Sequence, residues 1–131
     1  MCYRIEGGKL RVLLITSRGT RRWILPKGWP MAGKDDPESA RVEAWEEAGV
    51  TGRIGRRPLG CYTYRKRVID GHDLFCEVTV YPLRVTSLAA DYPERGQRRR
   101  KWMRRKNAAR RVAEDELARM VRRFDPRRGR V

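Results

Sequence analysis

The sequence predicts a single domain of the α/β class, because strand-like and helix-like segments both occur along its 131 residues. Several short runs are rich in apolar and β-branched residues, as buried strands are. One segment in the first half has helix start and stop signals, and another near the C-terminus has apolar residues at helical spacing. The 40% hydrophobic content is enough for one core, so we expect residues 1–131 to form one compact unit.

The first half opens with two predicted strands and a loop. Lys9–Thr16 is a run of leucine and β-branched residues followed by a turn-like Ser-Arg-Gly-Thr, which predicts a buried strand. Residues 23–25 predict a second strand, which Pro26 stops. Residues 27–34 are rich in glycine and proline and predict an irregular loop.

A helix is predicted over residues 37–48. Asp36 is the expected N-cap, and Pro37 suits the first helical position. Gly49 supplies the stop, because glycine readily takes the left-handed conformation that ends a helix.

The second half predicts mainly strands and then a C-terminal helix. Strands are expected at 51–57, 59–68 and 73–85, with a hairpin turn at Asp70-Gly71 and an edge or bulge at Pro82. A loop at 89–93 leads to a short strand around Trp102. Residues 107–124 predict a helix, and residues 125–131 predict a frayed tail.

The net charge of +16 points to a polyanionic partner. Basic residues concentrate in a C-terminal segment, 95–131, whereas six of the sixteen acidic residues lie between Asp35 and Glu47. That separation places a block of carboxylates where a cation could bind. It is the first indication of a site.

The cysteines and the hydropathy of the sequence indicate the cellular compartment. The three cysteines are odd in number, widely spaced and without a Cys-x-x-Cys pair, which argues against a disulfide framework and a zinc site. No apolar run approaches the roughly 20 residues that span a bilayer, and no leader-like segment opens the chain. We therefore expect a cytoplasmic protein that does not contact membranes.

Three glutamates on the predicted helix are candidates for metal binding and catalysis. Glu43, Glu46 and Glu47 stand at i, i+3 and i+4, so their carboxylates project from one face. A hard dication relieves the repulsion between such charges, which predicts Mg²⁺, with Mn²⁺ as a substitute. The simpler interpretation of the triplet alone is a solvated acidic helix face.

Residues 28–50 resemble the Nudix box. The matching positions agree in type at seven of nine places, and they read Gly28, Lys34, Val42, Glu43, Ala44, Glu46, Glu47, Gly49 and Val50. The departures are Lys34, where the box has Glu, and Val42, where it has Arg. Arg41 is one residue early and about 100° around the helix, so it is not a simple substitute.

The resemblance extends to the diphosphoinositol polyphosphate phosphohydrolase branch of the Nudix family, through residues 17–18, 23–30, 43–52 and 92–102. It implies an α/β/α sandwich with a mixed β-sheet, the loop-helix Nudix motif packed on one side and a C-terminal helix on the other. It also implies Mg²⁺-dependent hydrolysis of a P–O–P linkage in a diphosphoinositol polyphosphate or a dinucleoside polyphosphate.

Further site residues are nominated outside the glutamate triplet. Glu94 and Glu77 are further candidates for the general base, and Glu94 is also a candidate metal ligand. Each is weighed against an ordinary surface or structural role. Arginine grips phosphate oxygens in a bidentate way and lysine acts as a point charge. The candidate substrate-binding residues are Arg18, Lys27, Gly28, Trp29, Arg65 and Arg99.

Two alternatives stay open. The first is an RNA 5′-end pyrophosphohydrolase, which would use the basic segment to bind a nucleic-acid backbone. Aromatic residues do not interleave with the basic residues of this segment as they do in proteins that bind single strands, so nucleic acid is the less favoured partner. The departures at Lys34 and Val42 keep open a weakly catalytic polyanion- or RNA-binding protein on a Nudix scaffold. We expect a monomer or a homodimer.

Overall fold

The computed structural model describes residues 1–27, 33, 35–67 and 71–128. Its centre is a mixed six-stranded sheet with the order β3-β2-β1-β7-β4, in which β8 also pairs with β2. The β1–β7 pair is parallel and the other pairs are antiparallel. The strands are β1 (Cys2–Glu6), β2 (Lys9–Thr16), β3 (Trp23–Ile24), β4 (Val50–Ile54), β7 (Leu83–Leu88) and β8 (Arg100–Met103).

Strand β2 is the centre of the core, and both of its faces are covered. Val12 and Leu14 belong to one hydrophobic cluster, whereas Leu13 and Ile15 belong to another. Alternate side chains of a strand point to opposite faces of the sheet. A strand buried on both faces reads as a continuous apolar run, which is why the sequence alone identified β2.

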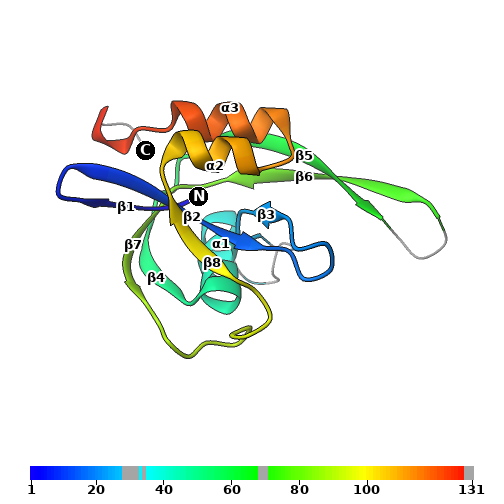
Figure 1. Cartoon of the computed structure of the whole chain (residues 1–131), viewed down its shortest axis with the longest axis horizontal. Coiled ribbons are helices and arrows are strands. Elements are labelled where there is room, and N and C mark those ends of the chain that lie inside the picture. Colours follow the sequence, from blue (N-terminus) through cyan, green and yellow to red (C-terminus); the bar gives the residue numbers. More distant parts are fainter. Residues whose placement is uncertain (28–32, 34, 68–70, 129–131) are drawn as a thin grey trace.

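Helices cover the two faces. Helix α1 (Asp36–Ala48) packs Ala44 and Ala48 into the cluster that contains Leu13 and Ile15. Helices α2 (Arg105–Arg111) and α3 (Asp115–Arg123) pack against the opposite cluster, and Figure 1 shows them as a layer away from α1. The predicted α/β sandwich around a mixed sheet is confirmed.

A two-stranded hairpin forms a separate sheet. β5 (Gly60–Arg67) and β6 (Asp73–Val80) pair antiparallel. Tyr62 and Val80 at its base are buried in the cluster beneath α3, whereas its far end extends away from the body of the molecule (Figure 1).

The elements predicted from the sequence differ from the structure in four main ways. β1 was not predicted at all. The predicted strand 73–85 is two strands, β6 and β7, because the chain leaves one sheet and joins the other at Tyr81 and Pro82. The predicted helix 107–124 is two helices, because Val112 and Glu114 both take extended backbone angles. Strand β4 ends at Ile54, three residues before the predicted end at residue 57.

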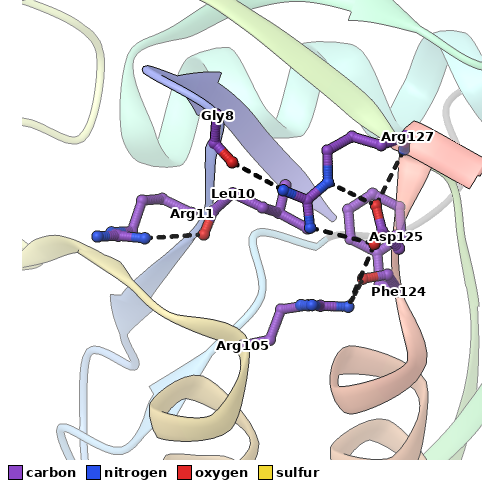
Figure 2. A network of polar contacts seen from close by, with 7 residues as sticks. All are labelled: Gly8, Leu10, Arg11, Arg105, Phe124, Asp125 and Arg127. Carbon is purple, nitrogen blue, oxygen red and sulfur yellow. Dashed lines mark hydrogen bonds and ion pairs between the residues drawn. The ribbon is translucent and has the colours of Figure 1, made fainter.

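The predicted frayed tail is also wrong as far as residue 128. Asp125 binds Arg127, whose guanidinium also donates to the Gly8 carbonyl at 2.8 Å, while Arg105 donates to the Phe124 carbonyl at 2.7 Å (Figure 2). These contacts fasten a short 3₁₀ turn, Pro126–Arg128, to the β1–β2 turn. Residues 129–131 lie outside the described residues.

Two further observations concern the helices and the cysteines. None of the helices in the described segments is long and apolar enough to cross a membrane. Cys2, Cys61 and Cys76 are all free thiols.

Candidate active site

Helix α1 presents the candidate carboxylates, and its two ends are firmly defined. At the N-terminus Asp35, and not the predicted Asp36, is the cap: its side chain accepts the Glu38 N–H at 3.0 Å. Asp36 is already helical, because the helix starts one residue earlier than predicted. At the C-terminus the Gly49 N–H donates to the Trp45 carbonyl at 2.9 Å.

Gly49 is required by both its conformation and its neighbours. Its φ of 69° is left-handed, and a Cβ there would lie 2.6 Å from the Tyr92 ring. Arg100 stacks on that ring and donates to the Ala48 carbonyl at 2.7 Å. The last turn of α1 is thus anchored to the segment that approaches β8.

Glu47 is the most deeply buried carboxylate in the described residues, with 3% of its surface exposed. Burial, and then the hydrogen bond it shares with Glu43, raises the pKa of Glu47 to about 8. Glu43 and Glu47 therefore meet on one face of α1, as their i, i+4 spacing predicts. Glu46 lies on the same helix, and its backbone carbonyl accepts the Glu94 N–H at 3.0 Å.

Arg98 joins two carboxylates from different parts of the chain. Its Nε donates to Glu94 at 3.0 Å, and its Nη2 lies 3.7 Å from Oε1 of Glu47. Its Nη1 donates to the Thr16 carbonyl at 3.2 Å. The guanidinium of Arg98 therefore contacts both Glu47 and Glu94, although Glu94 was nominated only from its loop context. Its role as a metal ligand stays a prediction.

Lys27 lies on the other side of Glu47. Its backbone N–H points at Oε1 of Glu47 at 3.4 Å, and its Nζ lies 4.5 Å from the centre of the Tyr64 ring. Burial lowers the pKa of the Lys27 ammonium, and the neighbouring Glu47 acts in the opposite direction. Of the nominated substrate-binding residues that the structure describes, Lys27 contacts a candidate glutamate.

A cavity of about 250 Å³ opens beside these groups. Its polar lining includes Lys27, Asp36, Glu43 and Glu77, and its floor is apolar, with Leu25, Val80 and Leu83 among the lining residues. Glu77, the second candidate general base, therefore faces the same space as Glu43.

The other nominated residues have different surroundings. Arg18 donates to the Gln97 side chain at 3.1 Å, and the guanidinium of Arg99 lies 5.9 Å from the Trp23 ring centre. Arg65 pairs with Asp73 at 3.6 Å, within the β5–β6 hairpin itself. Gly28, Trp29 and the departure at Lys34 lie outside the described residues.

The donor set fits a hard dication. Two carboxylates in contact, one of them buried, carry a repulsion that a bound cation relieves, and their oxygens are the ligands that Mg²⁺ prefers. As they stand, the described residues contain no group of three or more His, Cys, Asp or Glu side chains that could hold a metal. The structure thus brings Glu43 and Glu47 together, while the three-glutamate metal site stays a prediction.

Sequence reasoning missed Arg98. It stands in a run of four consecutive basic residues, 98–101, in which composition singles out no member. The only sequence signal was its position four residues after Glu94. Its contacts to Glu47 and Thr16 depend on the folded arrangement of three distant segments.

Comparisons with known proteins identify the family of the chain. A family model described as the NUDIX domain matches residues 1–124. "Nudix hydrolase 12, mitochondrial" from Arabidopsis thaliana is 35% identical over 103 residues, covering 76% of this chain and 51% of that protein. "Diphosphoinositol polyphosphate phosphohydrolase 3-beta" from Homo sapiens is 34% identical over 111 residues, covering 82% of this chain and 63% of that protein. The chain thus spans between half and two thirds of the length of these relatives.

Solved structures share the fold. A binary complex of C. elegans Ap4A hydrolase superposes with a TM-score of 0.62 at 23% identity, covering 92% of this chain and 88% of that chain. The MutT protein from Methanosarcina mazei gives a TM-score of 0.56 at 19% identity, covering 98% of this chain and 94% of that chain. With a matching mixed sheet, a carboxylate-bearing helix in place and a family model that covers residues 1–124, the chain belongs to the NUDIX domain family.

Proposed function

We propose that the chain catalyses Mg²⁺-dependent hydrolysis of a P–O–P linkage in a small, highly anionic substrate. The observation that carries this proposal is the contact between Glu43 and the buried Glu47 on α1, beside Lys27 and Arg98. Carboxylates and fixed cations in one place suit a phosphoanhydride, whose cleavage requires a bound metal and charge neutralisation together.

The chemistry of each side chain indicates its role in the proposed reaction. Glu43, Glu46, Glu47 and Glu94 would hold Mg²⁺, with Mn²⁺ as a substitute, and the metal supplies charge neutralisation and a more acidic water. Lys27 would bind phosphate beside Glu47. Arg18, Gly28, Trp29, Arg65 and Arg99 are the further proposed substrate contacts, of which Arg65 has the weakest geometric support because its partner lies on the hairpin.

The substrate class follows from charge and from the names of the relatives. The net charge of +16 favours a ligand with several phosphates, which attracts the protein over a distance. A relative at 34% identity is named for diphosphoinositol polyphosphates, and a structural neighbour is an Ap4A hydrolase. We propose one of these two classes, a diphosphoinositol polyphosphate or a dinucleoside polyphosphate. A cytoplasmic location and a monomeric or homodimeric state remain predictions.

A substrate panel tests the proposal. Purified protein is incubated with diadenosine polyphosphates, diphosphoinositol polyphosphates and 5′-triphosphorylated RNA, each with Mg²⁺ and with EDTA. Mg²⁺-dependent turnover of either small substrate supports the proposal, whereas turnover of the RNA alone supports the RNA 5′-end reaction. Binding of all three without turnover would identify a polyanion-binding protein and overturn the enzyme proposal.

A further inference from the structure

Helix α1 does not supply a cation to its own carboxylates. The position at which the resembled box has arginine is Val42, and the helix contains a single basic residue, Arg41. Nε of Arg41 donates to both Glu38 oxygens at 3.1 Å, one turn before the glutamate triplet. Arg41 is therefore committed to another carboxylate, and any fixed positive charge beside Glu47 must come from outside the helix.

Arg98 provides that charge, and its side chain is enclosed. Only 10% of the side chain is exposed, against 4% for Glu47 and 20% for Glu94. A buried guanidinium is tolerated only if its charge and its N–H groups are satisfied. Glu94 and the Thr16 carbonyl satisfy two of its nitrogens, and the third faces Glu47.

The backbone on both sides of Arg98 is fixed. Before it, the Glu94 N–H donates to the Glu46 carbonyl and the Gln97 N–H donates to the Glu94 carbonyl, both at 3.0 Å. After it, the Arg99 N–H donates to the Thr16 hydroxyl at 2.9 Å, and the Thr16 N–H donates to the Arg99 carbonyl at 3.0 Å. Arg98 is thus held between α1 and β2, so its guanidinium has little freedom to turn away.

The two carboxylates are held differently. The 3.0 Å contact to Glu94 is a charge-assisted hydrogen bond, whereas the 3.7 Å contact to Glu47 is an ion pair without a hydrogen bond. Arg98 therefore acts on Glu47 through its charge and does not use one of the carboxylate oxygens for a hydrogen bond. Arg98 can fix this carboxylate without occupying it.

From these contacts we infer that Arg98 is a positioning residue: it orients Glu47 from outside the helix and draws Glu94 into the same cluster. This inference rests on the proposed function, because it gives Glu47 a task in phosphoanhydride cleavage. Arg98 itself touches neither substrate nor metal in this role. Its loss should change how well the carboxylates bind a dication and how fast turnover proceeds, more than how tightly substrate binds.

The test compares three variants of the full chain. Arg98→Met removes the charge and keeps the length of the side chain, and Arg98→Lys keeps the charge with a different geometry. Arg95→Met is the matched control, since Arg95 lies in the same segment with a largely exposed side chain and a loose 3.9 Å contact to Asp91. For each variant, kcat and KM are measured on the substrate that the wild type hydrolyses, Mn²⁺ binding by electron paramagnetic resonance, and Tm.

We expect Arg98→Met to lower kcat by about tenfold or more, equivalent to about 1.4 kcal/mol of barrier, with KM within about threefold. Mn²⁺ binding should weaken several-fold, Arg98→Lys should recover part of both losses, and Arg95→Met should match the wild type. Unchanged kcat and Mn²⁺ binding in Arg98→Met, or equal losses in Arg95→Met, would overturn the inference.

A second measurement separates this inference from the proposed function. In metal-free protein at about pH 9, where the Glu47 carboxyl is ionised despite its raised pKa, the free energies of unfolding of Arg98→Met, Glu47→Gln and the double variant form a thermodynamic cycle. Non-additive values support the Arg98–Glu47 interaction, and additive values contradict it, whether or not any substrate is hydrolysed. If the wild type is inactive on every substrate, the proposed function fails, while the cycle and the Mn²⁺ titration still decide the role of Arg98.

Discussion

The Glu47 carboxylate occupies a place where its charge is costly unless a cation is near. It is buried, it shares a hydrogen bond with Glu43, and a fixed positive charge, on Arg98, lies 3.7 Å away. Such a group destabilises the metal-free protein when it ionises, because burial penalises the charged form. The cost of this charge agrees with the proposed role of Glu47 as a metal ligand, because a bound cation would offset it.

Replacing Glu47 should therefore stabilise the metal-free protein at alkaline pH. Because the folded-state pKa is raised from 4.5 to about 8, the folded state binds the extra proton, and stability falls as pH rises through that window. Glu47→Gln removes the titration, so its Tm in EDTA should exceed that of the wild type at about pH 8.5. The difference should narrow toward about pH 5, and a lower Tm for the variant at alkaline pH would contradict this picture.

Asp125 has the opposite pH behaviour. Its hydrogen bond with the Arg127 guanidinium lowers the pKa of the carboxyl to about 2 (Figure 2). Its contribution to stability is present above the ordinary carboxyl pKa of 3.8 and is lost as pH falls through about 2. Thermal melts of the wild type and Asp125→Asn should differ at about pH 5 and converge toward about pH 2. A constant difference across that range would show that Asp125 acts without its charge.

At the scale of elements, helix α1 depends on caps at both ends. Asp35 accepts the Glu38 N–H and also pairs with Arg56, so it joins the start of α1 to the chain beyond β4. Gly49 and the Tyr92–Arg100 stack hold the other end. The spacing of the glutamates has functional meaning only if these ends hold the helix in register against the sheet.

Removing the N-cap should loosen this helix. Asp35→Ala should lower the free energy of unfolding by about 1 kcal/mol, because one amide of the first turn loses its acceptor. Asp36→Ala is the matched control, since Asp36 lies within the helix and its loss should cost less. Urea denaturation measures the free energy of unfolding of both variants. A larger decrease in Asp36→Ala than in Asp35→Ala would show that Asp36, the residue predicted from the sequence, is the N-cap.

The elements that the sequence predicted correctly are those whose signal is local. β2 has an uninterrupted apolar run, and α1 has proline at its start and glycine at its end. β1 was missed because it has only five residues, although the Gly7-Gly8 pair that turns it into β2 is a hairpin signal. The α2–α3 break was missed because the helical spacing of apolar residues continues across Ala113, and neither proline nor glycine marks it.

The candidate site was only partly predictable for a related reason. Helical periodicity is sufficient to place Glu43 and Glu47 together, because both lie on one element. The approach of Lys27, Glu94 and Arg98 depends on where β2, α1 and the chain before β8 meet. No spacing within the sequence encodes a meeting of three separated segments.

At the scale of the whole molecule, charge is strongly segregated. The chain carries a net charge of +16, yet Asp36, Glu43 and Glu77 line one cavity. A positive molecule with an acidic recess attracts polyanions over its surface and concentrates dications at one place. Both effects would serve the proposed reaction, in which a phosphorylated substrate and a metal must meet.

Substrate capture should therefore depend on ionic strength. Raising KCl from about 20 to about 300 mM shortens the screening length from roughly 20 Å to below 10 Å, so the KM of a polyphosphate substrate should rise several-fold. The kcat should change less, because Glu47 is buried and the Arg98 side chain is only 10% exposed, so salt screens their charges poorly. Steady-state kinetics at fixed Mg²⁺ provide the test. A KM independent of salt would show that long-range electrostatic attraction does not contribute to substrate capture.

In the proposed function, the α1 glutamates enable metal-dependent cleavage of a phosphoanhydride. The most direct measurement is phosphate release by the wild type and by the triple variant Glu43→Gln, Glu46→Gln, Glu47→Gln, with Glu38→Gln on the same helix as the control. We expect Mg²⁺-dependent turnover by the wild type and the control, and a loss of about a hundredfold or more in the triple variant with its fold intact by circular dichroism. A folded triple variant that retains the wild-type rate would contradict the claim.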